Sequence, residues 1–318
     1  MIWQDKRVVV TGGAGFIGSH LVDLLRSKRA NVSIVDDLSR GKNVSGRLDN
    51  VDLRYSEPVF PYGSIVFHLA AKVTGIHYNR DHNFDMMQQN LAINWNVSEA
   101  VRKSRPALYV CVSTACVYPH NAPVPTPESA GDIGDPEPTN FGYGVAKWVS
   151  EQQAKYIYRE YEIPTMIVRF FNAFGPRDYY DNETSHVAPA LIKRVHELEE
   201  GEPLAVWGTG LQSRALVDAR DIANALLMLA ENKDAHNGEA VNIGHEQEIT
   251  INGLASMIMN LSGKSADIVN DRSMPDGYPR RAADTTKLRS LIGWVPDMPI
   301  ETTLRDMIAE FQAGRANL

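Results

Sequence analysis

Residues 7–18, R-V-V-V-T-G-G-A-G-F-I-G, decide the fold of this chain. The β-branched run at 8–10 predicts a buried parallel strand, and a helical pattern follows directly. Gly12, Gly15 and Gly18 have the spacing G-x-x-G-x-x-G. Glycines at these places suit a tight turn, a close approach of the backbone to a pyrophosphate, and a helix N-terminus aimed at negative charge. The stretch therefore predicts a dinucleotide-binding strand, turn and helix.

An acidic residue at the end of the next strand indicates which dinucleotide binds. The strand expected at 31–35 is followed by Asp36, eighteen residues after Gly18. A carboxylate near this distance accepts hydrogen bonds from the ribose hydroxyls of adenosine. It also repels a 2′-phosphate, so Asp36 favours NAD over NADP as the cofactor. Arg40 and Lys42 follow closely, and we interpret them as solvated loop charges.

A tyrosine and a lysine four residues apart add a proton-transfer site to this dinucleotide site. Tyr143 and Lys147 lie in N-F-G-Y-G-V-A-K-W (140–148), and residues at this spacing share one face of a helix. A lysine ammonium near the phenol favours the phenolate. Such a tyrosine can take a proton from a sugar hydroxyl while hydride leaves the same carbon. The spacing is common on solvated helices, so the glycine fingerprint is what favours the catalytic interpretation.

Strand and helix patterns alternate along the first half of the chain. Strands are expected at 7–11, 31–35, 51–55, 64–69, 107–113 and 164–169, and helices at 15–28, 84–104, 143–161 and 186–199. This alternation predicts an α/β fold with a doubly wound parallel sheet, the Rossmann arrangement, and ligands at the carboxyl ends of its strands. From about residue 172 the pattern loosens, with strands near 203–207 and 239–243 and helices near 220–231, 250–262 and 299–312. We therefore predict an NAD-binding domain at 1–171 and a smaller α/β substrate lobe, mainly at 172–318 and partly interleaved with the first domain.

The bulk properties exclude several classes of protein. The 318 residues carry a net charge of −7 and no basic run, so nucleic acid is not an expected partner. No apolar stretch approaches a membrane span, and residues 1–6 are too short and polar for a signal peptide. Cys111 and Cys116 would stand roughly 16 Å apart on one extended segment, too far for a disulfide. We therefore expect a reduced, cytoplasmic protein that does not bind membranes.

Several motifs in a fixed order resemble the extended short-chain dehydrogenase/reductase family over nearly the whole chain. They are G-G-A-G-F-I-G (12–18), H-L-A-A (68–71), Asn90, S-T-A-C-V-Y (113–118), Y-G-V-A-K (143–147), R-F-F-N-A-F-G-P (169–176), S-R-A-L-V-D-A-R-D-I-A (213–223) and A-D-T-T-K-L (283–288). Members of the family mostly act on sugars attached to nucleoside diphosphates. The resemblance assigns cofactor contacts to Gly12, Gly15, Phe16, Ile17, Gly18, Asp36, Ala70, Asn90, Tyr143 and Lys147.

The segment that follows the strand ending near Thr114 decides the chemistry. By resemblance, Thr114 hydrogen-bonds the reacting hydroxyl beside Tyr143; the alternative is a strand threonine favoured by its β-branching. Related 4,6-dehydratases carry an Asp-Glu pair directly after this threonine, where this chain has Ala115 and Cys116. Dehydration needs a general acid and a general base there, so we set that activity aside.

Cys116 resembles the cysteine of two enzyme groups, the GDP-fucose synthases and the GDP-mannose 3,5-epimerases, which exchange protons at C3 and C5. The first group pairs its cysteine with a histidine in a segment like S-H-V-A-P-A-L-I-K-R (185–194), where His186 falls. A thiol and an imidazole can act as base and acid at a carbon acidified by a neighbouring carbonyl. The alternative is a small buried thiol and a histidine at the start of a helix. Cys111, inside V-C-V, is expected to be structural.

Further residues are candidates for binding the nucleotide sugar. By resemblance, Asn172 and Arg214 hold the diphosphate, for which a guanidinium is suited by charge and geometry. Arg281 and Lys193 are candidates of the same kind, with a solvated side chain as the alternative for Lys193. Trp207, in V-W-G-T-G, is expected either to stack near the nucleotide base or to pack the lobe.

Three functions remain open. The first is an NAD-dependent nucleotide-sugar epimerase that oxidises C4 transiently and inverts neighbouring centres, as GDP-mannose 3,5-epimerases do; a simple C4 epimerase of UDP-glucose or UDP-glucuronate is a variant of it. The second is a 3,5-epimerase and 4-reductase like the GDP-fucose synthases, which usually consume NADPH and which Asp36 disfavours. The third is a non-catalytic nucleotide sensor, which the complete set of catalytic candidates disfavours.

The helices expected at 84–104 and 143–161 carry more apolar residues than one core face needs, namely Met87, Leu91, Val149 and Tyr156. Together with the family resemblance, this predicts a homodimer in which two helices from each subunit form a four-helix bundle.

Overall fold

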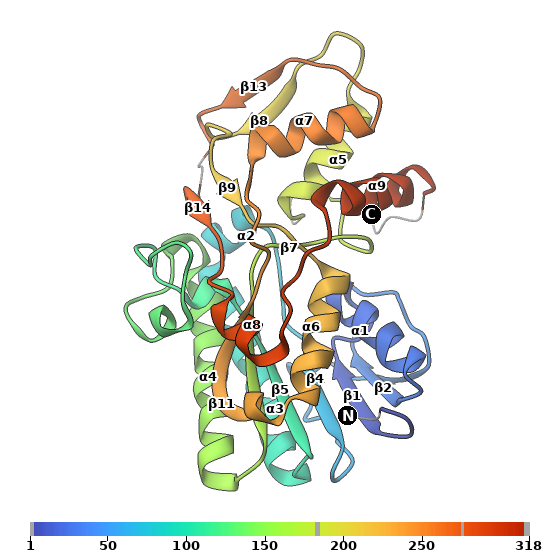
Figure 1. Cartoon of the computed structure of the whole chain (residues 1–318), viewed down its shortest axis with the longest axis vertical. Helices are drawn as coiled ribbons and strands as arrows, with labels where there is room; N and C mark the ends of the chain where they lie inside the picture. The colour runs from blue at the N-terminus through green and yellow to red at the C-terminus, as the bar shows by residue number, and fades with distance from the viewer. Residues whose placement is uncertain (1–2, 182–184, 275–276, 315–318) are drawn as a thin grey trace.

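A seven-stranded parallel sheet forms the centre of the computed structural model, which describes residues 3–181, 185–274 and 277–314 (Figure 1). The strand order is β11-β6-β5-β4-β1-β2-β3. These strands are β11 (Asn237–Ile243), β6 (Thr165–Phe170), β5 (Leu108–Thr114), β4 (Ile65–His68), β1 (Arg7–Thr11), β2 (Asn31–Asp36) and β3 (Arg47–Asn50). Adjacent strands pair in parallel throughout, so the prediction of a doubly wound α/β fold is confirmed.

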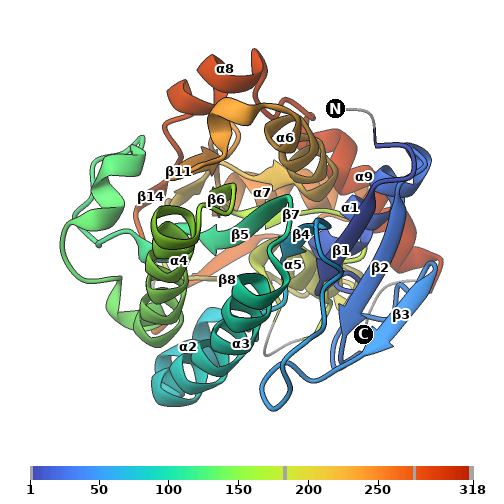
Figure 2. The same cartoon turned by 90° about the horizontal axis from the view of Figure 1, so that it is seen from below.

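Helices cover both faces of this sheet (Figure 2). On one face lie α1 (Phe16–Ser27), α6 (Ala219–Glu231) and α8 (Thr286–Ile292), and on the other lie α3 (Asn83–Ser104) and α4 (Phe141–Tyr161). Each face has its own apolar cluster, because the buried strands alternate Val, Ile and Leu between the two sides. Parallel strands all end at the same edge, so the loops that follow β1, β2, β4 and β5 meet there.

A smaller lobe stands above that edge (Figure 1). It contains α5 (Val187–Glu197), α7 (Ile251–Leu261), α9 (Ile300–Gln312) and the parallel pair β8 (Leu204–Trp207) and β13 (Ile268–Asp271). A separate apolar cluster joins these helices to the pair. Between the lobe and the large sheet lie α2 (Ile76–Asp81), β7 (Ala173–Phe174) paired with β10 (Val217–Asp218), and a three-stranded sheet of β12 (Ile249–Thr250), β9 (Ser213–Arg214) and β14 (Arg280–Arg281).

Two assignments made from the pattern differ from the structure. The strand expected at 51–55 is wrong: the third strand is β3 (Arg47–Asn50), an edge strand with half-exposed side chains that carry little apolar signal. The strand and helix that the pattern assigned to the smaller lobe, near 239–243 and 220–231, are β11 and α6 and complete the large sheet and its cover. The chain therefore crosses between the two parts more than once.

The two cysteines lie on different elements, so the distance worked out for one extended segment does not apply. Strand β5 ends at Thr114, and Ala115–Val117 form a single 3₁₀ turn. Cys111 is fully buried within β5, whereas Cys116 is partly exposed in the turn, and both are free thiols. The turn places Cys116 at the carboxyl edge of the sheet, where the other candidate residues gather.

Candidate functional site

The glycine-rich loop between β1 and α1 leaves no room for side chains at two of its glycines. Gly12 has a φ of +70°, and a Cβ there would lie 2.7 Å from the backbone nitrogen of Ala70. A Cβ at Gly18 would overlap the carbonyl oxygen of Gly12. At Gly15, in contrast, the only atom within 4 Å of such a Cβ is the Gly12 carbonyl oxygen, at 3.3 Å. The backbone at Gly15 is therefore open to a ligand, as a pyrophosphate cradle requires.

Helix α1 begins directly at this loop with a bare N-terminus. Gly15 is its N-cap and supplies no side-chain hydrogen bond, and its first turn contains no acidic residue. The N–H groups of the first turn belong to Phe16, Ile17 and Gly18. They have no partner within the helix, because no helical carbonyl precedes them by four residues. Such N–H groups and the helix dipole attract an anion. The loop and the helix start therefore fit the pyrophosphate of a dinucleotide.

Asp36 lies at the carboxyl end of β2, and its carboxylate is bonded to the same loop. Oδ2 accepts a hydrogen bond from the Ala14 nitrogen at 3.0 Å, and Oδ1 accepts one from the Leu38 nitrogen at 2.9 Å. Burial raises the pKa of Asp36, and these two hydrogen bonds oppose the rise. A second carboxylate, Asp37, follows directly. The preference for NAD over NADP that Asp36 predicts stays a prediction.

The loop after β4 forms the opposite side of the cofactor cradle. The Ala70 nitrogen donates to Thr11 Oγ1 at 3.2 Å, which ties this loop to the end of β1. Asn90, fully buried on α3, accepts from the Lys72 nitrogen and donates to the Lys72 oxygen, both at 3.0 Å. Asn90 therefore shapes the loop that carries Ala70 through its backbone. A direct contact of Ala70 or Asn90 with the cofactor stays a prediction.

Thr114 is the last residue of β5, and it organises the turn that contains Cys116. Its Oγ1 accepts a hydrogen bond from the Cys116 nitrogen at 3.2 Å, as an N-cap does. The hydroxyl therefore lies at the carboxyl edge of the sheet, beside the start of the turn. This position suits the predicted role of Thr114 as a donor or acceptor for a reacting hydroxyl.

Tyr143 and Lys147 lie on α4, as predicted. The Lys147 ammonium is bonded to a backbone oxygen of β5, and no hydrogen bond to the Tyr143 phenol is seen among the described residues. Lys147 is almost fully buried, and its Nζ donates to the Val112 oxygen at 3.0 Å. Burial lowers the pKa of Lys147 and raises that of Tyr143. The charges that act on Tyr143 are those of Cys116 and Arg281. The Lys147 ammonium is bonded to the backbone of β5, and its stabilisation of a Tyr143 phenolate stays a prediction.

Cys116 contacts a group that the sequence assigned to the diphosphate. Arg281, on β14, donates from Nη2 to Cys116 Sγ at 3.2 Å. The guanidinium carbon of Arg281 also lies 5.2 Å from the centre of the Tyr278 ring. Sequence reasoning missed Tyr278, because a tyrosine in a loop carries no periodic signal. Three distant parts of the chain, which contain Cys116, Tyr143 and the pair Tyr278 and Arg281, therefore lie close together.

His186, the expected partner of Cys116, makes its hydrogen bonds elsewhere. Its Nδ1 lies 3.3 and 3.2 Å from the two carboxylate oxygens of Asp178, which is buried. The Asp178 carboxylate raises the pKa of His186, and the charge of Arg40 opposes it. His186 is also the N-cap residue of α5, as the alternative interpretation expected. The pairing of His186 with Cys116 in catalysis stays a prediction.

The remaining substrate candidates contact their own lobe. Asn172 donates to the Ala215 and Arg281 oxygens at 3.1 and 2.9 Å, and Arg214 donates to the Ser213 and Tyr278 oxygens, both at 2.7 Å. Arg194 stacks on Trp207 with its guanidinium carbon 4.5 Å from the ring centre. Lys193 Nζ lies 3.9 Å from Glu197 Oε1. Asn172 and Arg214 therefore hold together the backbone around Arg281, whatever else they bind.

Sequence reasoning also missed Asp52, because it placed a strand over this residue. In the structure Asp52 follows β3 at the carboxyl edge, next to the end of β2, where the Val51 nitrogen donates to the Asp36 oxygen at 3.2 Å. Hydrogen bonds from Arg54 lower the pKa of Asp52. Asp52 therefore lies at the carboxyl edge, beside the end of the strand that carries Asp36.

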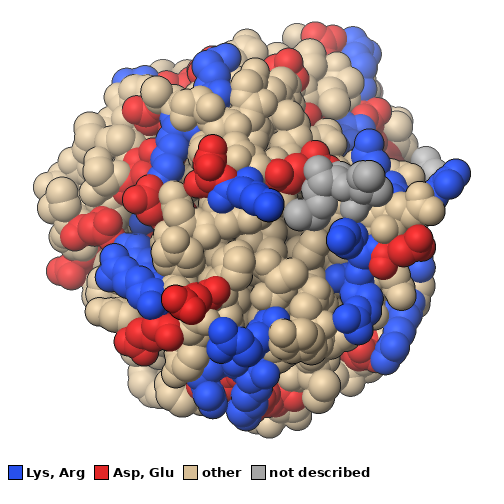
Figure 3. Space-filling view, turned by 60° about the horizontal axis from the view of Figure 1, so that its bottom comes forward, with Lys and Arg blue, Asp and Glu red and all other residues tan. Residues whose placement is uncertain are grey.

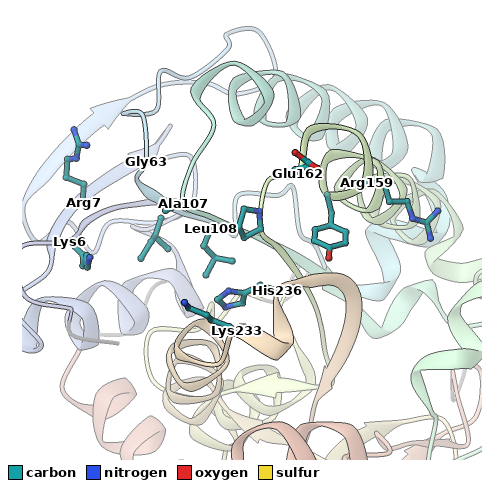
Figure 4. A pocket seen from close by; sticks show the side chains of 12 residues that line it. Lys6, Arg7, Gly63, Ala107, Leu108, Arg159, Glu162, Lys233 and His236 are labelled. Carbon is teal, nitrogen blue, oxygen red and sulfur yellow. The ribbon is translucent and has the colours of Figure 1, made fainter.

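A cavity of about 820 Å³ lies at the opposite, amino edge of the sheet, away from all predicted site residues (Figure 4). It is lined by Lys6, Arg7, Gly63, Ile65, Ala107, Leu108, Tyr158, Arg159, Glu162, Pro164, Lys233 and His236. Helices α4 and α6 end beside it, and cations there complement the carbonyl groups of helix C-termini. Basic and acidic side chains are interspersed over this face (Figure 3). We therefore place the functional site at the carboxyl edge and not in this cavity.

Among the described residues, no helix has both the length and the apolar character that crossing a membrane would require.

Comparison with known proteins agrees with the geometry of the carboxyl edge. Residues 8–244 match the model of the "NAD dependent epimerase/dehydratase family". The chain is 33% identical over 321 residues to GDP-L-fucose synthase 1 of Arabidopsis thaliana, covering 96% of this chain and 92% of the relative. It is 31% identical over 312 residues to GDP-L-fucose synthase of Escherichia coli (strain K12), covering 95% of each.

Solved structures show the same fold. A UDP-glucose 4-epimerase from Thermotoga maritima, crystallised with UDP-glucose, superposes with a TM-score of 0.85 at 27% identity, over 97% of this chain and 99% of that chain. A UDP-N-acetylglucosamine 4-epimerase from Methanobrevibacter ruminantium M1 superposes with a TM-score of 0.84 at 28% identity, over 98% and 99%.

Proposed function

The chain belongs to the NAD-dependent epimerase/dehydratase family, and from this premise we propose that it is a nucleotide-sugar enzyme with two coupled activities. It exchanges protons at the carbons next to a C4 ketone of a GDP-linked hexose, and it transfers hydride at C4. The relatives named GDP-L-fucose synthase support this function over that of a GDP-mannose 3,5-epimerase. The substrate is a nucleoside-diphosphate sugar, and the expected place of action is the cytoplasm.

The observation that carries the proposal is the position of Cys116. Cys116 lies in the turn directly after Thr114, and its carbonyl oxygen packs against Gly144, the residue after Tyr143. A group that removes a proton from a carbon must lie next to the groups that handle the C4 oxygen, because the ketone is what makes that proton acidic. A C4 epimerase has no need of a thiol at this place.

The residues at the carboxyl edge divide between cofactor and sugar. The glycine loop would hold the pyrophosphate of the cofactor, Asp36 would bind the adenosine ribose with Asp52 near the adenine, and Lys147 would hold the nicotinamide ribose. The bound dinucleotide would supply or accept the hydride at C4. Tyr143 and Thr114 bind the C4 oxygen and move its proton.

The substrate candidates extend this site into the smaller lobe. Asn172, Lys193 and Arg214 bind the diphosphate, and Trp207 contacts the nucleotide base. His186, supported by Asp178, delivers a proton to the face of the sugar opposite Cys116.

The proposal is tested with GDP-4-keto-6-deoxymannose in deuterated water, with NADH or NADPH supplied separately. We expect solvent deuterium at C3 and C5 and one reduced cofactor consumed for each product, with NADH preferred. Consumption of cofactor without deuterium at either carbon would refute the exchange activity. Deuterium without consumption would leave an epimerase and remove the reductase step.

A simple C4 epimerase is the second candidate. The similarity to the UDP-glucose 4-epimerase structure and the carboxylate of Asp36 favour it, because such an enzyme keeps NAD bound and returns its hydride. Incubation with UDP-glucose and no added cofactor separates the candidates. Formation of UDP-galactose, at an unchanged rate in Cys116→Ser, would establish the second candidate and make the thiol structural.

A further inference from the structure

Arg281 makes a specific contact with the proposed proton-exchange group. Its Nη2 donates to Cys116 Sγ at 3.2 Å, although the two residues are 165 positions apart in the sequence. Its guanidinium also lies over Tyr278, whose Oη donates to the Tyr118 oxygen at 3.3 Å. Tyr118 ends the turn that contains Cys116. The guanidinium of Arg281 and the ring of Tyr278 therefore both contact the turn that contains Cys116, and they do so from the same side.

The backbone of Arg281 is held as firmly as its side chain. The Arg281 oxygen accepts hydrogen bonds from Asn172 Nδ2 at 2.9 Å and from the Ala215 nitrogen at 3.2 Å. Arg281 also pairs with Arg214 in the sheet of β9 and β14. An arginine fixed at both ends can hold a neighbouring atom in one direction, and this is the property that a positioning residue needs.

The charge of Arg281 persists in this surrounding. Burial acts against the guanidinium, but Cys116, Tyr278 and Glu137 act in its favour, so the pKa of Arg281 is raised. A fixed cation stabilises any negative charge that develops beside it in a partly buried site. At Cys116 such a charge exists whenever the sulfur has no proton and can serve as a base.

We propose that Arg281 is the positioning residue of Cys116, holding the sulfur toward the sugar and stabilising it in the deprotonated form. This inference rests on the proposed proton exchange. In the step, the C–H bond next to the C4 ketone breaks and its proton bonds to sulfur. The electron pair moves into the enolate, whose charge lies on the C4 oxygen near Tyr143 and Thr114. A proton from an acid on the other face then restores the C–H bond, and both groups re-equilibrate with solvent.

This role differs from that of a diphosphate ligand. A diphosphate ligand would change the affinity for every nucleotide sugar and would leave the thiol unaffected. A positioning residue changes the reactivity of the thiol even without substrate. The two roles can therefore be separated before any turnover is measured.

The first experiment follows the alkylation of Cys116 by iodoacetamide as a function of pH, read by peptide mass spectrometry on the full chain. We compare the wild type with Arg281→Gln, Arg281→Lys and the control Arg280→Gln, whose side chain pairs with Glu248 at an exposed place. In Arg281→Gln, we expect the midpoint of the pH profile to rise by about one unit, the effect of losing one nearby opposite charge. In Arg281→Lys, which keeps the positive charge, the midpoint should stay close to that of the wild type. In Arg280→Gln it should equal that of the wild type.

Access alone would change the rate plateau and not the midpoint, so the midpoint separates charge from crowding. Fully buried Cys111 reports the fold of each variant, because it becomes alkylated only when the sheet opens. An unchanged midpoint in folded Arg281→Gln overturns the proposal.

The second experiment measures deuterium entry at C3 and C5 of GDP-4-keto-6-deoxymannose. In Arg281→Gln, we expect the kcat of deuterium exchange to fall at least tenfold. Hydride transfer at C4 should still be measurable. If only KM rises, Arg281 is a diphosphate ligand and the proposal fails. If the wild type exchanges no deuterium, the proposed function fails, and the alkylation profile still decides whether Arg281 acts on the thiol.

Discussion

We expect Glu151→Gln to destabilise the protein strongly, because it breaks a buried ion pair. The side chains of Arg169 and Glu151 are 1% and 0% exposed. Arg169 donates from Nε to Oε1 at 2.9 Å and from Nη2 to Oε2 at 2.6 Å, and Ser113 also donates to Oε1. A glutamine replaces one acceptor oxygen by a donor that faces a donor. The guanidinium remains buried without a counter-charge.

The magnitude follows from this burial. Removing one partner of a buried ion pair costs about 3–5 kcal/mol, and at about 2 °C per kcal/mol for a chain of this size Tm falls by about 6–10 °C. The matched control is Glu301→Gln on α9, whose partner Arg305 lies at 2.6 Å with side chains 54% and 62% exposed. An exposed pair of this kind contributes less than about 1 kcal/mol.

Thermal and denaturant unfolding, each followed by two probes, measure both variants. Glu151→Gln/Arg169→Met removes both charges and should recover a large part of the loss, because no charge stays buried alone. If Glu151→Gln costs no more than Glu301→Gln, the pair contributes no more than an exposed one and the argument from burial is wrong. Ser113 precedes Thr114, so a fall in kcat should accompany the loss of stability.

Three further outcomes are expected. Calorimetry should give at least tenfold tighter binding of NAD(H) than NADP(H), or about 1.4 kcal/mol, because of Asp36, and equal affinities would contradict this. Light scattering at micromolar concentration should give the mass of a homodimer, since Trp95, Trp148 and Tyr156 are exposed on α3 and α4; a monomer mass would refute it. Burial lowers the pKa of His68 from 6.5 to about 3, so its stabilising contribution is complete above pH 6.5 and is lost progressively as the pH falls toward 3. Acid unfolding should therefore be shallower in His68→Gln, and an identical profile would exclude His68 as the cause.

The parts of the fold that depend on neighbours in sequence were predictable. The glycine loop, the position of Asp36 and the shared helix face of Tyr143 and Lys147 all follow from spacings of a few residues. The buried strands were found because Val, Ile and Leu dominate them. Strand β3 was not, because Arg47–Asn50 is polar and half-exposed at the sheet edge, while the apolar residues after it lie in a turn.

The long-range contacts that complete the site could not be predicted from patterns in the sequence. Strands β9 and β14 have two residues each, too few for a period-2 signal. The contact between Arg281 and Cys116 joins segments that no spacing relates, and the resemblance pointed to His186 instead. The direction of the Lys147 ammonium depends on the Val112 carbonyl, which sequence does not reveal.

Because of strand β14, the groups proposed for proton exchange come from a different part of the fold than the groups proposed for hydride transfer. The groups proposed for hydride transfer come from the loops of the large sheet and from α4, so one folding unit supplies them. The thiol on that same unit meets its guanidinium only through a strand paired to β9, between the large sheet and the smaller lobe. If Arg281 acts on Cys116 as we propose, a shift of strand β14 would stop proton exchange and leave the cofactor-binding half of the molecule unchanged.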